Sequence, residues 1–125
     1  MIDVKDLVLK LEQNKINFFC GVPDSLLKPF TSYIEKFKKK KNLICANEGG
    51  AVGVAVGNYL SSQKISCVYM QNSGLGNAVN PLASIAHKKI YSIPMVLMIG
   101  WRGAPGTNDE AQHEKQGLIT KELLK

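Results

Sequence analysis

The sequence predicts an α/β fold, a three-layer α/β/α arrangement in which helices cover both faces of a mostly parallel sheet. Apolar runs of strand length alternate with segments whose apolar residues recur at helical spacing. The runs are apolar at nearly every position, which is typical of parallel strands buried on both faces. Four of them lead into loops of glycine, short polar and charged residues, and in a parallel sheet such loops share the carboxyl edge, where ligands bind.

The apolar pattern of the first half of the sequence predicts two helices and two strands. Asp3 can cap a helix whose apolar positions recur from Val4 to Leu11, and residues 18–20 form a short buried strand. A second helix is predicted to begin near Asp24 or Ser25, and residues 43–46 form the second strand. The second helix is expected to bury Leu26, Leu27, Phe30, Ile34 and Phe37.

The second half continues the alternation. A glycine-rich helix is predicted from about residue 48 to 60, and a strand over residues 65–70. Another helix begins beyond Gly74 and ends near His87. Residues 94–99 form the fourth strand, with Pro94 tolerated at its start, and the stretch from Gln112 to Lys125 is helical.

Composition limits the classes of function. The chain has 125 residues, of which 45% are apolar and 21% charged, enough for one domain with its own core. No apolar stretch approaches the length of a membrane span, so we expect a cytoplasmic protein with no membrane contact. Much of the net charge of +6 lies in Lys36 and in lysines 38–41, and no nucleic-acid motif surrounds them. A solvated helix end is therefore favoured over nucleic-acid binding.

The cysteines and histidines give further expectations. Cys20, Cys45 and Cys67 share no metal-like spacing and fall in apolar runs, so we expect buried free thiols, which suit a reducing compartment. His87 lies late in a helix beside two lysines, where a solvated cation at the helix C-terminus is the simple interpretation.

Glu48 is the most informative residue of the chain. It stands at the head of the glycine-rich helix, where a carboxylate faces the positive end of the helix dipole. The adjacent Gly49 and Gly50 would let a flat ring approach the backbone. The plain alternative is that the small residues only pack this helix closely and Glu48 only complements the dipole.

Four segments in order carry a resemblance to a known family. They read FCGVPDSL (19–26), NEGGA (47–51), QNSGLGN (71–77) and TNDEAQH (107–113). Together they resemble the pyrimidine-binding domain of thiamine-diphosphate-dependent 2-oxoacid decarboxylases, most closely the phosphonopyruvate and sulfopyruvate decarboxylases. The resemblance covers nearly the whole chain, and we expect residues 1–125 to form one pyrimidine-binding domain. The resemblance implies a thiamine-diphosphate-binding fold that is incomplete at its C-terminus.

The resemblance implies roles for several residues. Glu48 would hydrogen-bond a ring nitrogen of the cofactor and promote deprotonation of its thiazolium carbon. Asp24, besides capping a helix, would orient substrate or transfer a proton, and His113 would share in proton transfer and aldehyde release. Related decarboxylases often carry two adjacent histidines here, whereas Glu114 follows His113. The loop after the third strand would contact the ring portion of the cofactor through Ser73, Gly74, Leu75 and Asn77.

Arg102 is the candidate for binding an anionic group of the substrate. It stands between Trp101 and Gly103 at a strand end, where its guanidinium can form a bidentate pair with a phosphonate or sulfonate. An arginine of a surface loop stacked on Trp101 is an equally good interpretation. The overall basic charge can also steer an anionic substrate toward the site.

The partner of this domain follows from the same resemblance. In the family a second domain holds the diphosphate through magnesium with a Gly-Asp-Gly motif, which this sequence does not contain. We therefore expect a fragment or separate subunit that pairs with a diphosphate-binding chain, forms a homo-oligomer, and holds no metal itself. The expected reaction is decarboxylation of phosphonopyruvate to phosphonoacetaldehyde. The alternatives are a sulfopyruvate decarboxylase alpha subunit and, in a different class, a noncatalytic interaction module.

Overall fold

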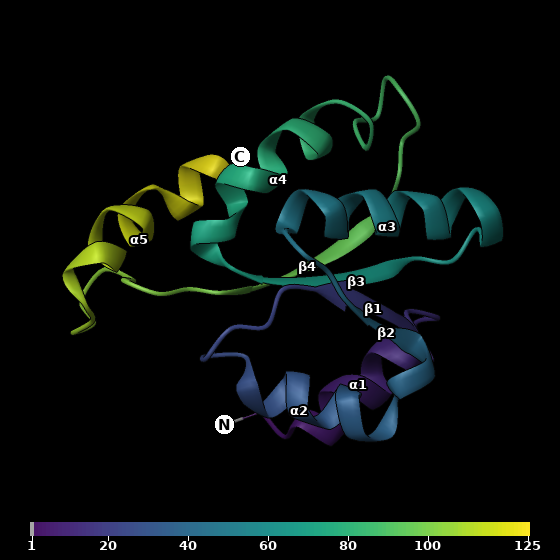
Figure 1. The fold of residues 1–125 in the computed structure, drawn as a ribbon, viewed down its shortest axis with the longest axis horizontal. Helices are drawn as coiled ribbons and strands as arrows, with labels where there is room; N and C mark the ends of the chain where they lie inside the picture. The colour runs from purple at the N-terminus through teal and green to yellow at the C-terminus, as the bar shows by residue number, and fades with distance from the viewer. Residues whose placement is uncertain (1) are drawn as a thin grey trace.

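A computed structural model describes residues 2–125 and contains one sheet with helices on both faces (Figure 1). The sheet has four strands in the order β2-β1-β3-β4, and every neighbouring pair is parallel. In chain order the elements are α1 (Val4–Gln13), β1 (Phe18–Gly21), α2 (Lys28–Phe37), the 3₁₀ helix η1 (Lys39–Lys41), β2 (Asn42–Ile44), α3 (Glu48–Ser62), β3 (Ser66–Gln71), the 3₁₀ helix η2 (Asn72–Gly74), α4 (Leu75–Ala83), β4 (Met95–Gly100) and α5 (Ala111–Leu123).

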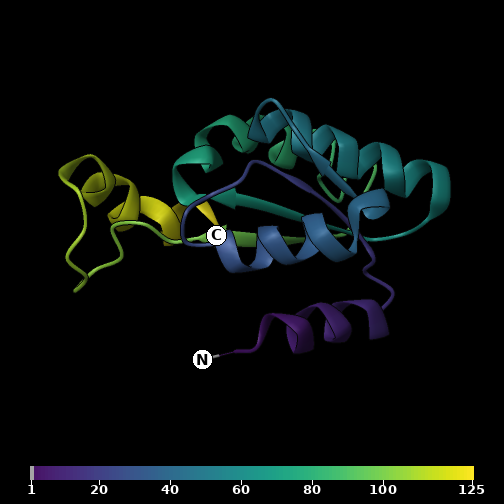
Figure 2. The ribbon, with the colours of Figure 1, turned by 60° about the horizontal axis from the view of Figure 1, so that its bottom comes forward.

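The helices form two layers, and the predicted three-layer α/β/α fold is confirmed. Helices α3 and α4 cover one face of the sheet, and α1 and α2 cover the other (Figures 1 and 2). Helix α5 belongs to neither layer, because it lies beyond the carboxyl ends of the strands (Figure 1). Among residues 2–125 no helix is both long enough and apolar enough to cross a membrane.

Each face of the sheet has its own core. Under α3 and α4 the core includes Cys20, Val68 and Leu75, and under α1 and α2 it includes Phe19 and Tyr69. Successive strand residues point to opposite faces, so neighbours along β1 and β3 enter different cores. This explains why β3 is buried at all of its first five positions.

Strand β2 differs from its prediction in both length and burial. It ends at Ile44, and Leu43 and Ile44 are 46% and 53% exposed. The cause is its place at the edge of the sheet, where only β1 pairs with it, so an apolar run is not enough to bury it. Cys45, expected to be buried, is consequently half-buried, while Cys20 and Cys67 are buried; all three are free thiols.

Two helix boundaries also differ from the sequence-based expectation. Helix α2 begins at Lys28 because the preceding turn is held by the Asp24 side chain, and Leu26 and Phe37 are exposed rather than buried. Helix α4 ends at Ala83, short of His87, and Pro81 stands inside its last turn, where it supplies no backbone N–H.

Candidate functional site

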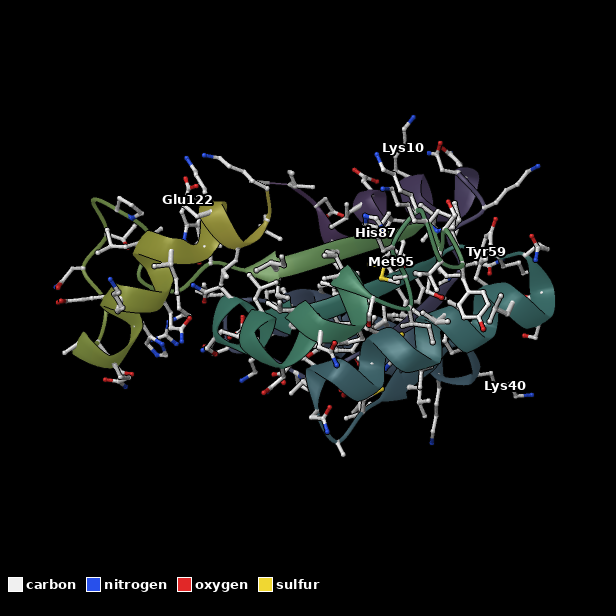
Figure 3. The ribbon with its side chains drawn as sticks, turned by 90° about the horizontal axis from the view of Figure 1, so that it is seen from above. Lys10, Lys40, Tyr59, His87, Met95 and Glu122 are labelled. Carbon is white, nitrogen blue, oxygen red and sulfur yellow. The ribbon has the colours of Figure 1, made fainter. Side chains whose placement is uncertain are left out.

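The four strand-end loops meet at the carboxyl edge of the sheet, as the parallel order requires. In Figure 1 this edge faces left, toward α5, and the first turn of α3 lies beside the start of α4. His87, Tyr59 and Met95 lie together toward the other end of the molecule, away from Glu122 on α5 (Figure 3). His87 is therefore remote from the edge at which the site residues gather.

Glu48 is the first residue of α3 and is half-buried. The side chain of Asn47 caps the helix by accepting the Gly50 N–H at 2.8 Å, so the helix begins with Glu48 at its positive end. Glu48 Oε2 accepts a hydrogen bond from Asn77 Nδ2 at 2.8 Å. Its other oxygen, Oε1, accepts no hydrogen bond from residues 2–125.

A glycine makes room for the Glu48 carboxylate. A Cβ at Gly74 would collide with Cγ, Cδ and Oε1 of Glu48, so the side chain lies directly on the backbone of η2. A Cβ at Gly49 would lie 2.8 Å from the carbonyl oxygen of Asn77, so the starts of α3 and α4 also touch closely. The carboxylate is thus fixed between two helix starts with one oxygen left for a ligand.

The other residues predicted to touch the cofactor differ in what they offer. Gly74 and Asn77 border Glu48 directly. The Ser73 hydroxyl accepts a hydrogen bond from Gln71 Nε2 at 2.7 Å. The side chain of Leu75 is 1% exposed and belongs to the core, so only its main chain is available to a ligand.

Asp24 carries a buried oxygen without a partner. Its Oδ2 accepts the N–H groups of Leu26 and Leu27 at 3.1 and 3.3 Å, which holds the turn before α2. The carboxylate packs on Gly100 at the end of β4, where a Cβ would collide with Oδ2. Its Oδ1 is buried and accepts no hydrogen bond from the described residues. A buried acceptor left in this state costs free energy, so Oδ1 is an atom that a ligand or a proton would satisfy.

Arg102 is paired with Asp109 inside its own loop. Its Nε and Nη2 donate to Oδ2 and Oδ1 of Asp109 at 2.8 and 2.5 Å, and Nη1 donates to Ser25 Oγ at 3.0 Å. The Arg102 hydrogen bonds hold the pKa of Asp109 well below its ordinary range, with help from the Gly103 N–H, and Asp109 raises the pKa of Arg102. The ring of Trp101 lies under Lys121 Nζ, 5.1 Å from the ring centroid.

His113 lies in the first turn of α5 with a mostly buried side chain. Its Nε2 is 3.5 Å from Glu110 Oε2. His87, by contrast, is exposed, and its Nδ1 accepts the Lys89 N–H at 3.2 Å. The structure therefore places His113, and not His87, on an element at the carboxyl edge.

Sequence reasoning missed Asn72 as a separate feature of this edge. Asn72 is fully buried at the end of β3, and its amide donates to the Arg102 carbonyl and to Thr120 Oγ1, both at 2.9 Å. Its Oδ1 accepts the Arg102 N–H at 3.1 Å. The only signal in the sequence was an amide immediately after an apolar strand, and the interpretation of the whole loop as ligand-binding obscured it.

The donor set fits the organic half of a cofactor rather than a metal. Within residues 2–125 no group of at least three His, Cys, Asp or Glu side chains could hold a metal ion. What the edge offers instead is a carboxylate with one unpaired oxygen, lying on a glycine beside backbone of two helix starts. This arrangement suits a flat heterocycle with a ring nitrogen that can hydrogen-bond to Glu48.

This fold and this site define a domain of a thiamine-diphosphate-dependent enzyme. Residues 4–123 match the family described as thiamine pyrophosphate enzyme, N-terminal TPP binding domain, and the chain belongs to that family. The resemblance inferred from the four sequence segments is confirmed.

The curated relatives include decarboxylases of two kinds. The chain is 40% identical over 124 residues to a phosphonopyruvate decarboxylase of Streptomyces viridochromogenes, covering 99% of this chain and 30% of that protein. It is 39% identical over 93 residues to a sulfopyruvate decarboxylase subunit alpha of Methanocaldococcus jannaschii, covering 74% of this chain and 53% of the subunit. The chain therefore spans about a third to a half of the length of these relatives.

A solved structure supports the same fold. The benzoylformate decarboxylase of Polynucleobacter necessarius superposes with a TM-score of 0.65 at 25% identity. The match covers 82% of this chain and 19% of that enzyme. The sheet and its covering helices are thus the architecture of a known decarboxylase domain.

Proposed function

We propose that this chain supplies the aminopyrimidine-binding half of a thiamine-diphosphate site in a decarboxylase that acts on an anionic 2-oxoacid. The observation that carries the proposal is the Glu48 carboxylate, fixed by Asn77 and Gly74 with Oε1 free. When bound, the cofactor supplies the electron sink that loss of carbon dioxide requires. Glu48 Oε1 would hold the proton shared with a ring nitrogen of the cofactor, while Gly74 and Asn77 keep the carboxylate in place.

Asp24 and His113 are proposed as the groups that handle protons near the substrate. Asp24 Oδ1 is buried and unpaired, so it is ready to accept a hydrogen bond or to hold a proton beside the reacting atoms. His113 carries an imidazole, the side chain that most often serves as a general acid or base.

The substrate we propose is phosphonopyruvate, with sulfopyruvate as the alternative, because curated relatives carry those names. Arg102 would meet the second anionic group. Its guanidinium has five N–H donors, and its three hydrogen bonds to Asp109 and Ser25 leave two for an anion. Substitution of Arg102 by Gln should then harm turnover of the doubly anionic substrates more than turnover of pyruvate.

The partner we propose is a chain or domain that binds the diphosphate through magnesium. Relatives described as a subunit alpha suggest a partner subunit. Helix α3 offers a surface for one, because a Cβ at Gly53 or Gly57 would meet no atom within 4 Å and Leu60 is 50% exposed. We further propose a homo-oligomer with two-fold symmetry and a cytoplasmic location, which the free thiols favour.

A reconstitution experiment tests the function. The purified chain alone should release no carbon dioxide from phosphonopyruvate or sulfopyruvate, and activity should appear when the complementary diphosphate-binding domain, magnesium and cofactor are added. Glu48→Gln keeps the size of the side chain but cannot relay the proton, so turnover should fall by about a hundredfold or more.

Glu35→Gln is the matched control, because Glu35 is exposed on α2, on the opposite face of the sheet. It should leave turnover unchanged. Binding of the partner chain without carbon dioxide release by any combination would favour the noncatalytic interaction module. Near-normal turnover by Glu48→Gln would remove Glu48 from the mechanism.

A further inference from the structure

The ion pair of Arg102 and Asp109 joins the two ends of the loop between β4 and α5. Besides its two hydrogen bonds to Arg102, Asp109 accepts the Gly103 N–H with Oδ2 and the Glu110 N–H with Oδ1, each at 2.8 Å. One carboxylate therefore satisfies backbone groups at both ends of the loop. The side chains of the pair are only 17% and 15% exposed, so water competes little for these bonds.

The same arginine reaches the loop that carries Asp24. Arg102 Nη1 donates to the hydroxyl of Ser25, the residue after Asp24, and the Asp24 carboxylate packs on Gly100 two residues before Arg102. The side-chain amide of Asn72 meanwhile bonds both the N–H and the C=O of Arg102. The main chain of Arg102 is thereby fixed from β3 while its guanidinium joins the two loops.

The closed loop also determines where His113 lies. A Cβ at Gly103 would collide with the carbonyl oxygen of His113, and a Cβ at Gly117 would collide with that of Gly103. The backbone of Gly103 therefore touches α5 over the turn that carries His113. Asp109 holds the N–H of Gly103, and Gly103 in turn contacts the backbone of His113. A substitution at Asp109 that moves Gly103 would therefore also move His113.

We propose that Arg102 and Asp109 form a positioning clamp, which fixes His113 on one side and the Asp24 loop on the other. Through it the two proton-handling groups keep a set spacing at the carboxyl edge while the cofactor half-site is open. The inference rests on the proposed function for the roles of Asp24 and His113. The clamp itself is a structural claim that can be tested without any catalytic activity.

The structural test uses nuclear magnetic resonance on the full chain. Asp109→Ala should speed hydrogen exchange of the Gly103 amide by about tenfold or more and shift the imidazole signals of His113. The chain has two histidines, so His87 serves as the internal reference. Asp109→Asn, which keeps the volume of the side chain, takes the place of the alanine variant if that variant does not fold.

The control is Glu12→Gln, which removes another ion pair of similar exposure, Lys38 Nζ to Glu12 Oε1 at 2.8 Å, 23% and 22% exposed. It should leave the Gly103 and His113 signals unchanged. Wild-type exchange at Gly103 and an unshifted His113 in the Asp109 variant would overturn the clamp. Equal shifts in the Glu12 variant would overturn it too, since they would indicate a general loss of stability.

The kinetic test uses the reconstituted assembly. Asp109→Asn should lower kcat about tenfold on pyruvate, which has no second anionic group for Arg102 to meet, because misplaced proton donors slow the chemical step. Arg102→Lys keeps the positive charge but loses the planar pair of N–H donors, so kcat should fall in this variant as well. Unchanged kcat in Asp109→Asn, or full activity in Arg102→Lys, would contradict the positioning role. An inactive wild-type assembly with the expected magnetic resonance result would refute the proposed function and leave the clamp standing.

Discussion

At the scale of single residues, the absence of one side chain decides the environment of Glu48. Gly74 has no Cβ, and the Glu48 carboxylate occupies the space that a Cβ would need. Asn77 then holds one carboxylate oxygen, and the other accepts no hydrogen bond from residues 2–125. The nearby Gly76 has no such role, because a Cβ there would meet no atom within 4 Å.

This contrast predicts the effect of Gly74→Ala. The new methyl group would push the flexible end of Glu48 aside, so the fold should persist while turnover of the reconstituted assembly falls about tenfold or more. Carbon dioxide release and a thermal melt measure the two effects separately. Gly76→Ala is the control and should retain turnover. A Gly74→Ala variant as active as wild type would show that Glu48 does not depend on this contact.

At the scale of elements, α5 is docked by backbone rather than by an apolar face. Leu118, on the outer side, is 63% exposed, while Gly117 and Thr120 are the buried positions. Gly117 touches the backbone of Gly103, and its carbonyl accepts the indole N–H of Trp101 at 3.0 Å. A helix held in this way tolerates no added volume at its contact point.

Gly117→Ala should therefore loosen α5. Its Cβ would collide with main-chain atoms of Gly103 that cannot turn aside, and overpacking of this kind typically costs about 1 to 3 kcal/mol. The chain has one tryptophan, so the fluorescence of Trp101 reports the docking of α5 directly during a urea titration.

Gly53→Ala provides the comparison for that experiment. Its Cβ meets nothing within 4 Å on α3, so it should change stability by no more than about 1 kcal/mol, in the favourable direction, and leave Trp101 fluorescence unchanged. Equal stability of Gly117→Ala and wild type would mean that α5 is not anchored at Gly103.

At the scale of the whole molecule, the central strands bury groups that ordinarily titrate in alkali. Burial raises the pKa of the thiols of Cys20 and Cys67 to about 12. Burial likewise raises the pKa of Tyr69 to about 12. All three residues belong to the two cores of the sheet, one on each face.

These shifts predict that the protein loses stability in alkali. In the unfolded chain the thiols and the phenol release protons at about pH 8.5 and 10, so a rising pH first lowers the free energy of the unfolded state. The stabilisation is complete below the unfolded pKa values and disappears as pH approaches the folded values near 12. The free energy of unfolding should fall by about 2 kcal/mol or more from about pH 8 to about pH 11.

Urea midpoints across that range measure the loss. Cys67→Ala removes one titrating group, so its stability should fall less steeply with pH than that of the wild type. A free energy of unfolding that stays constant to pH 11 would mean that the buried groups do not titrate with folding.

Much of the fold and part of the site follow from the sequence alone. Alternating apolar runs and helical periods determine the layers, because each strand or helix carries its own pattern. The parallel order then brings Asp24, Glu48 and Arg102 to one edge, and the four motif segments identify the family. The helix cap at Asn47, which the sequence analysis did not predict, is also a local contact, since it joins residues three apart.

The exposure of β2 and the partners of Arg102 depend on the tertiary structure, because they arise from contacts that the local sequence pattern does not contain. Only the sheet order makes β2 an edge strand, so the sequence could not reveal that Leu43 and Ile44 stay exposed. The hydrogen bond from Arg102 to Ser25 likewise joins segments that are distant in the sequence, and the pairing with Asp109 depends on how the loop between them closes. The guanidinium is a general anion binder, and chain folding alone determines which carboxylate lies within its reach.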